Sequence, residues 1–194
     1  MTHVRPRALL AAMLGLAPTV SCGVAINGQP VPAINVSVAL PFDPTIAERI
    51  NGRNDGSTFE PCIAYRADEL TPLGIDPGSV NDAGFSDSPN FRGCDWDSPD
   101  RTVIFTQVLG DEESLEKYKR KQSFRLWQPD RITEGRAIAV APEAPNACIA
   151  VFMSADAIVA TAVGVKTNRP PSPGLKDECD KAYAFASLAA SKAP

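Results

Sequence analysis

Two long apolar runs near the C-terminal end of the chain give the clearest structural signal. Residues 148–153 (CIAVFM) and 157–165 (AIVATAVGV) are almost uninterrupted, and only residues 154–156 (SAD) separate them. A near-continuous apolar run of strand length is typical of a strand buried on both faces. The two runs therefore predict an antiparallel hairpin in the middle of a sheet.

Shorter stretches add strands to this hairpin. Residues 102–109 (TVIFTQVL) are rich in β-branched side chains and follow a turn, which predicts a strand. We expect further strands at 78–85, 91–97 and 136–141, and a short edge strand at 34–40.

Helix signals predict helices at 44–50, 59–70, 111–126 and 175–192. In 111–126 the acids crowd the first turn and the bases follow, the order that the helix dipole favours, and one face is largely apolar. The last segment carries a stripe of small residues that allows a helix to lie close to a sheet, at Cys179, Ala182, Ala186 and Ala189.

The order of these elements predicts the fold class. Runs of antiparallel strands with helices on one side are typical of an α+β fold. We expect a two-layer sandwich, with a mainly antiparallel sheet and helices packed on one face. Neither an internal repeat nor a second domain boundary is evident, so residues 41–194 are expected to form a single domain.

The N-terminal segment has the pattern of a secretory signal. Residues 1–7 (MTHVRPR) carry two arginines and no acid, and residues 8–17 (ALLAAMLGLA) are uncharged and mostly apolar. This run is shorter than the ~20 residues that a membrane span needs. A charged start, a short apolar core and small residues after it predict a signal peptide over residues 1–21. The uncharged segment 22–40 is expected to be a tether.

Four of the five cysteines lie at long spacings that do not match a zinc site, whose ligands come in close pairs. They are expected to form disulfides, and four cysteines allow three pairings. We favour Cys62–Cys94 and Cys148–Cys179. Each of these bridges would join a helix to a neighbouring strand, and the two would close loops of similar length.

Cys22 makes the cysteine count odd and follows the apolar core of the signal. Its surroundings resemble the lipobox of bacterial lipoproteins, in which the cysteine becomes the acylated N-terminus. Ser21 and Gly23 fit that pattern, whereas Thr19 stands where leucine is usual. We therefore expect lipidation at Cys22 and attachment to the extracytoplasmic face of the cell membrane. Ordinary signal cleavage nearby, which would leave a free thiol, is the alternative.

Charge and composition exclude several function classes. Removal of residues 1–21 lowers the basic side chains from 19 to 17, against 23 acidic ones, which gives a formal charge of −6. An acidic domain is a poor partner for nucleic acid. The only histidine, His3, lies in the signal, so the mature chain has no Ser-His-Asp triad and lacks the commonest catalytic zinc ligand. We expect no enzymatic activity, no catalytic residues, no metal and no cofactor.

Two local patterns have a functional and a structural interpretation. Ser114 and Lys117 match the S-x-x-K form of serine acyl-enzymes, but the companion motifs are missing, and we interpret both residues as an exposed helix face. The same helix predicts a basic surface patch that could contact anionic lipid headgroups, or that is simply solvated. The patch comprises Lys117, Arg120, Lys121 and Arg125.

The arrangement of cysteines around one tryptophan resembles a known family. Its elements are Phe59-x-Pro61-Cys62 at the start of a helix, Cys94-x-Trp96, Cys148, and Cys179 in a late helix. They resemble an uncharacterised family of actinobacterial cell-envelope lipoproteins, mycobacterial ones among them, over residues 59–190. The resemblance implies a signal, a lipidated cysteine, a tether and one disulfide-linked α/β domain, and it implies no catalytic residue.

These observations lead to an expected function. We expect a membrane-anchored envelope lipoprotein whose non-enzymatic domain binds a hydrophobic ligand or an envelope protein. One alternative is a cell-wall enzyme that uses carboxylates alone, and another is an accessory subunit of an envelope complex. An apolar cavity would favour ligand binding, facing carboxylates would favour the enzyme, and a flat apolar patch would favour the accessory role.

Overall fold

The hairpin expected from the two apolar runs forms the centre of a sheet. In the computed structural model, which describes residues 39–46, 48–83 and 89–194, β6 (Ala147–Ser154) pairs antiparallel with β7 (Ala157–Val165). The register runs from Ala147 opposite Gly164 to Ser154 opposite Ala157. Both strands are buried on both faces over most of their length, as continuous apolar runs predict.

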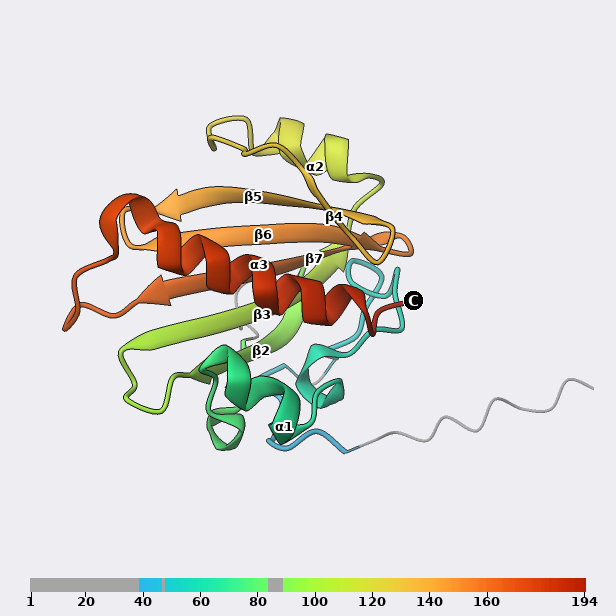
Figure 1. The fold of residues 1–194 in the computed structure, drawn as a ribbon. Helices are drawn as coiled ribbons and strands as arrows, with labels where there is room; N and C mark the ends of the chain where they lie inside the picture. Colours follow the sequence, from blue (N-terminus) through green and yellow to red (C-terminus); the bar gives the residue numbers. More distant parts are fainter. Residues whose placement is uncertain (1–38, 47, 84–88) are drawn as a thin grey trace, which may run out of the picture. The chain divides into compact units, whose positions relative to one another are not determined.

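Within the described ranges the sheet has seven strands in the order β1-β2-β3-β7-β6-β5-β4, and all of its pairs are antiparallel (Figure 1). The strands predicted at 91–97, 102–109 and 136–141 are confirmed. The strands besides the central hairpin are β1 (Asn81–Asp82), β2 (Arg92–Asp97), β3 (Val103–Asp111), β4 (Arg131–Thr133) and β5 (Arg136–Ala144).

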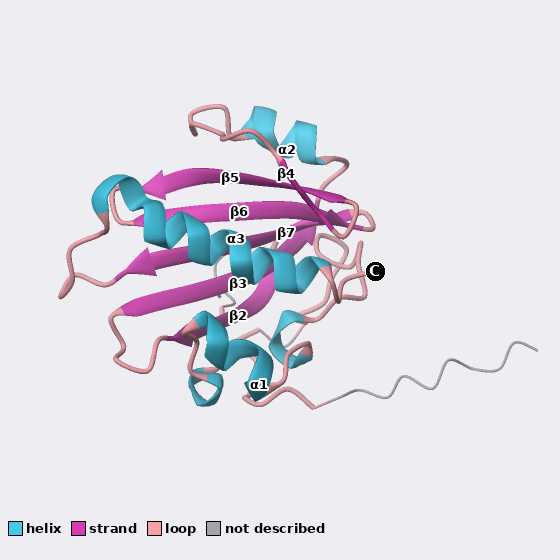
Figure 2. Cartoon of the chain, in the orientation of Figure 1, coloured by secondary structure: helices cyan, strands magenta, loops and turns pink. Residues whose placement is uncertain are grey.

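One face of the sheet is covered by the C-terminal helix, α3 (Lys176–Ala190), which crosses the strands in Figure 2. The small side chains predicted to line this helix are buried, which brings its backbone close to the strands. Phe185 projects from the helix into an aromatic cluster, with ring centroids 5.2 Å from Tyr65 and 5.5 Å from Trp96. The helix α1 (Ala67–Leu70) adds Leu70 to the same core.

The other face is partly covered by the short helix α2 (Leu115–Lys121), at the top of Figure 1. Leu115 packs on this face with Val151 of β6 and Ile158 of β7, and Tyr118 and Trp127 pack against the same cluster. The α+β class, the antiparallel sheet and the helices packed on it are confirmed. The expectation of helices on one face holds for α1 and α3, whereas α2 lies on the second face.

The predicted helix at 44–50 is wrong: the residues described there form bends and a turn. Tertiary contacts outweigh the local helix-capping signals in this segment. The backbone amide of Thr45 donates to the side chain of Asp82, 2.7 Å away, and Arg49 is buried among charged partners.

The other differences also arise from tertiary contacts. The predicted helix 59–70 is divided into η1 (Pro61–Ile63) and α1, with Tyr65 in the core between them, and η2 (Thr71–Leu73) follows α1 directly. The predicted helix 111–126 shortens to α2, because Asp111 still pairs with Ala157 as the last residue of β3.

One expected strand is shorter than predicted, and another lies mostly outside the described residues. Of the strand predicted at 78–85, β1 remains, preceded by η3 (Pro77–Ser79). Most of the edge strand predicted at 34–40 lies outside the described residues, as does Cys22. Among the helices of the described residues, none is long and apolar enough to cross a bilayer.

Candidate functional site

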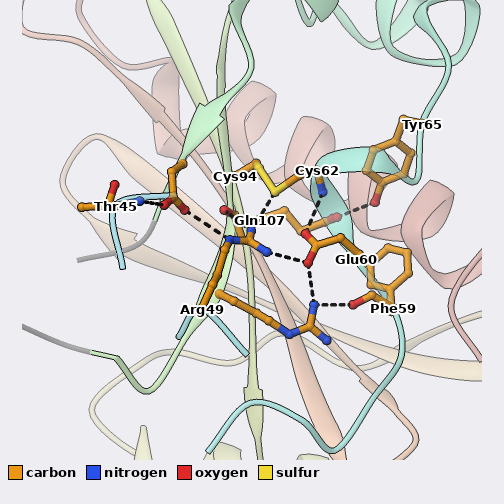
Figure 3. Close-up of a disulfide and its surroundings, with 11 residues drawn as sticks. Thr45, Arg49, Phe59, Glu60, Cys62, Tyr65, Cys94 and Gln107 are labelled. Atoms are coloured by element: carbon orange, nitrogen blue, oxygen red, sulfur yellow. Dashed lines mark hydrogen bonds and ion pairs between the residues drawn. A yellow bond between two sulfur atoms is a disulfide. The ribbon is translucent and has the colours of Figure 1, made fainter. Parts of the chain in front are cut away.

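The described part of the chain contains two disulfides, and both have the predicted pairing. Cys62 of η1 is bonded to Cys94 of β2 with their Cα atoms 5.4 Å apart, and Cys148 of β6 is bonded to Cys179 of α3 at 5.0 Å (Figure 3 shows the first). Each bridge joins a helical segment to a strand, and all four cysteines are buried. These sulfur atoms are structural and offer no thiol nucleophile.

A cluster of buried charges lies beside the Cys62–Cys94 bridge (Figure 3). The Glu60 carboxylate accepts from Arg49 Nη1 at 2.5 Å and from Arg92 Nη1 at 2.9 Å. Arg49 Nε also lies 3.5 Å from Asp82 Oδ1, and its Nη2 donates to the carbonyl of Gly93 at 2.9 Å. One carboxylate therefore neutralises two guanidinium groups, and Asp82 adds a second negative charge.

Arg92 anchors the irregular segment that precedes η1. Its guanidinium donates to the carbonyl oxygens of Asn54, Ser57 and Phe59 at 3.0, 2.6 and 2.7 Å, and the side chain is 2% exposed. Burial lowers the pKa of Arg92, and the Glu60 carboxylate opposes that shift. Because each Arg92 nitrogen donates to a protein acceptor and the side chain is closed to solvent, Arg92 holds this loop on the sheet.

A second buried polar group lies under α3. The Tyr65 hydroxyl donates to Gln107 Oε1, and Gln107 Nε2 donates to Thr161 Oγ1 at 2.9 Å. Burial raises the pKa of Tyr65 well above its ordinary value, so the phenol stays a neutral donor. Gln107 and Thr161 are fully enclosed, and this chain of hydrogen bonds is part of the core.

An accessible hollow whose lining combines several kinds of side chain lies on the second face of the sheet, beside α2. It is an open cleft of about 530 Å³ between α2, the end of β3 and two loops around residues 52–53 and 90–91. Its lining combines aromatic, amide and charged side chains with two glycines: Gly52, Arg53, Asn90, Phe91, Gly110, Asp111, Glu112, Tyr118, Lys121, Gln122 and Ile158.

Two aromatic rings give the cleft its apolar surface. Phe91 is 38% exposed and lies against the backbone of Gly110, where an added Cβ would stand 2.6 Å from the Phe91 ring. Tyr118 contacts Trp127 edge-to-face, with ring centroids 6.2 Å apart. Burial raises the pKa of Tyr118, which keeps its hydroxyl neutral at physiological pH.

The cleft is lined by both cationic and anionic side chains. Lys121 Nζ lies 2.6 Å from Glu112 Oε2, and Asp111 Oδ1 accepts from the backbone amide of Gly56 at 2.8 Å. Arg53 Nη1 donates to Asn90 Oδ1 at 2.5 Å. A smaller hollow of about 380 Å³ adjoins the cleft and shares Asp111, Glu112 and Lys121 with it. The cleft is thus polar, accessible and electrically balanced.

The structure places the predicted basic patch on α2 and the loop after it, mixed with acids. Lys117 pairs with Glu113, Lys121 pairs with Glu112, and Arg125 Nη2 lies 2.9 Å from Glu143 Oε1. Arg120 is exposed on the same helix. Lys121 is the patch residue that lines the cleft.

The S-x-x-K pair has a structural role. Ser114 is the N-cap of α2, and its hydroxyl accepts from the backbone amide of Lys117 at 3.1 Å. No group of side chains suited to hold a metal ion occurs among the residues that the structure describes.

The cleft is the feature that sequence reasoning missed. Its residues come from separate segments that only the folded sheet brings together, and none belongs to a motif. One signal was available: Gly110 interrupts a strand otherwise rich in larger side chains, and a glycine within a strand often marks a close approach of another group. Here that group is the Phe91 ring.

Comparisons with known proteins identify a family whose function is unknown. No curated protein and no solved structure matches this chain. A family model described as "Protein of unknown function (DUF3558)" matches residues 18–192, which include the cleft and all four paired cysteines. The resemblance to an uncharacterised family is confirmed to this extent, and the chain belongs to the DUF3558 family.

Proposed function

We propose that this protein is a lipid-anchored lipoprotein of an actinobacterial-type cell envelope, and that its domain binds a ligand without transforming it. The observation that carries the binding function is the open cleft beside α2. Concave sites with aromatic walls and a few convergent polar groups are the usual form of ligand sites.

The sequence supports the anchor. Residues 1–21 have the pattern of a secretory signal, and Cys22 follows it directly. The other four cysteines are paired in disulfides, which suits an oxidising compartment outside the cytoplasm and leaves Cys22 as the cysteine available for acylation.

The contacts in the cleft favour binding over catalysis by carboxylates. Asp111 is bonded to the Gly56 amide and Glu112 to Lys121. A general acid or base needs a carboxyl group that is free to exchange a proton with substrate. Both carboxylates instead already contact donors of the protein itself.

A specific observation favours an accessory role as the second candidate. Phe124 and Leu126, in the loop after α2, are 73% and 82% exposed. Large apolar side chains that remain this exposed together are typical of surfaces that contact another protein.

The anchor is tested by a Cys22→Ala variant produced in an actinobacterial host. We expect the wild-type protein in the membrane fraction and the variant in the soluble fraction or the medium, with unchanged folding of the domain. Retention of the variant in the membrane fraction, at the level of the wild type, would overturn the lipid anchor.

The binding function is tested by native mass spectrometry of the protein purified from that envelope. We expect a co-purifying small molecule that is lost in an Arg53→Ala variant and retained in an Arg169→Ala variant, because Arg169 is exposed and away from the cleft. A bare chain in every preparation would contradict ligand binding, and a bound protein retained in both variants would favour the accessory role.

A further inference from the structure

We infer that the ligand of the cleft is a neutral saccharide that stacks on Phe91 and forms hydrogen bonds with the polar rim. This inference rests on the proposed binding function and names the chemical class of the ligand. It follows from the charge balance of the cleft, from the hydrogen-bonding groups that remain open, and from the exposed ring.

The charge balance argues for a neutral ligand. The cleft contains two cations, Arg53 and Lys121, and two anions, Asp111 and Glu112. Lys121 and Glu112 already neutralise each other at 2.6 Å. In a cleft that holds equal numbers of cations and anions, the attraction of a charged ligand to one side chain is offset by repulsion from another of like charge. A neutral polar ligand meets no such repulsion.

The open hydrogen-bonding groups argue for hydroxyls. Across the described residues, no protein partner bonds to the Tyr118 hydroxyl, to Asn90 Nδ2 or to Gln122 Nε2, so donors of three residues that line the cleft remain open. The second carboxylate oxygen of Asp111 is an acceptor, since Oδ1 alone bonds to Gly56. A hydroxyl both donates and accepts, so several hydroxyls on one ligand match a rim of both kinds.

The same groups argue against a long apolar ligand. An acyl chain in this cleft would cover the Tyr118 hydroxyl and the Asn90 and Gln122 amides without offering them a partner. A buried polar group that loses its bond to water costs ~1–3 kcal/mol. The expectation of a hydrophobic ligand is therefore replaced, for this cleft, by a polar one.

The exposed Phe91 ring supplies the missing apolar contact. A sugar ring has one face of C–H groups beside its hydroxyls, and that face packs against an aromatic plane. Phe91 is available for such packing because it is only partly buried, and the Gly110 backbone supports its inner side. Aromatic side chains with an accessible face contribute strongly to binding surfaces.

The test uses the full-length lipoprotein in a detergent without a sugar headgroup. Binding is measured on a printed panel of neutral glycans, among them maltotetraose and chitotetraose, together with tetragalacturonate as an anionic sugar. Free decanoate, which combines an apolar chain with an anionic carboxylate, is tested by displacement. Contacts are then located by saturation-transfer NMR on the sugar protons.

We expect one or more neutral glycans to bind, with saturation transfer strongest on the ring protons. Phe91→Ala should weaken binding at least 10-fold, and Tyr118→Phe should weaken it ~3- to 10-fold, the value of one neutral hydrogen bond. The matched controls are Phe124→Ala, an exposed aromatic outside the cleft, and Tyr183→Phe, whose hydroxyl bonds to Thr133 beside α3. Both controls should leave the affinity unchanged.

The outcomes separate this inference from the proposed function. Binding of decanoate or tetragalacturonate in preference to every neutral glycan, with loss in Phe91→Ala, would overturn the neutral saccharide and support a ligand site in the cleft. Glycan binding that is unaffected by Phe91→Ala and Tyr118→Phe would show that the glycan binds outside the cleft, which contradicts the proposed site. If no panel member binds, the saccharide inference fails, and a bare chain in native mass spectrometry would then overturn the proposed function as well.

Discussion

Glu60 and Arg92 form an ion pair of 2.9 Å, between Oε2 and Nη1, in the interior beside the Cys62–Cys94 bridge. The same carboxylate oxygen also pairs with Arg49. One acid therefore compensates two buried cations, and it does so at the point where an irregular loop meets β2.

A Glu60→Gln variant should be strongly destabilised, because it leaves two guanidinium groups buried with less compensation. Removing one partner of a buried ion pair costs ~3–5 kcal/mol, and we expect a loss in this range in the free energy of unfolding, measured by urea denaturation. Glu48→Gln, at an exposed position nearby, is the matched control and should change stability little. Equal stability of the two variants would show that the cluster is solvated in solution.

The buried chain from Tyr65 through Gln107 to Thr161 gives a second prediction. Gln107→Leu leaves two hydroxyls without their partner, and each unsatisfied group costs ~1–3 kcal/mol. We expect a loss of about 2–4 kcal/mol in the free energy of unfolding. The triple variant Tyr65→Phe, Gln107→Leu, Thr161→Val should recover most of it, since no polar group is then orphaned. Failure of the triple variant to recover stability would point to packing defects as the cause.

Each disulfide should stabilise the domain by a similar amount. The bridges span 32 and 31 residues, and closing loops of that size restricts the unfolded chain by ~3.7 kcal/mol in the entropic description. We therefore expect the Cys62→Ala/Cys94→Ala and Cys148→Ala/Cys179→Ala pairs to lose comparable free energies of unfolding. A much larger loss for one pair would show that its packing contributes as well as its cross-link.

Asp95 gives a prediction for pH. Burial raises the pKa of Asp95, and the Asp82 and Asp97 carboxylates add to that shift, while the bond from Thr106 Oγ1, 2.5 Å away, opposes it. A raised carboxyl pKa means that ionisation costs the folded state more than the unfolded one, so stability falls as pH rises from the unfolded pKa through the folded pKa. Asp95→Asn should therefore be more stable than wild type at pH 7.

The gain of Asp95→Asn should vanish below the unfolded pKa of Asp95, where the carboxyl is protonated in both states. Thermal melting at a series of pH values checks this, with Asp43→Asn at an exposed position as the control. A gain that persists unchanged at low pH would have to come from packing, and would contradict the role of ionisation.

The prediction of the fold succeeded where burial alone decides structure. The runs that became β6 and β7 are apolar throughout, and such runs have few alternatives to a central strand. The last helix is similar, because its stripe of small residues lets it lie close to a sheet. The cysteine pairing also followed, since each bridge connects neighbours in the order of elements.

Prediction failed where charged and polar side chains make distant contacts. The segment before Cys62 has helix-starting signals, yet Arg49 is held by Glu60 and Asp82, and these contacts outweigh a propensity of a few tenths of a kcal/mol per residue. The cleft could not be predicted for the same reason, because Arg53, Phe91 and Tyr118 meet only in the fold.

The sequence by itself determined the sheet's central hairpin, the covering helix, the cysteines that pair and the expectation of an anchor at Cys22, because these depend on local periodicity and composition. Only the tertiary structure decided that α2 lies on the second face and that a balanced, aromatic cleft opens beside it. The cleft exists because β3 pairs with β7 and because Arg92 holds the loop that precedes η1. Both contacts connect residues that are far apart in the chain.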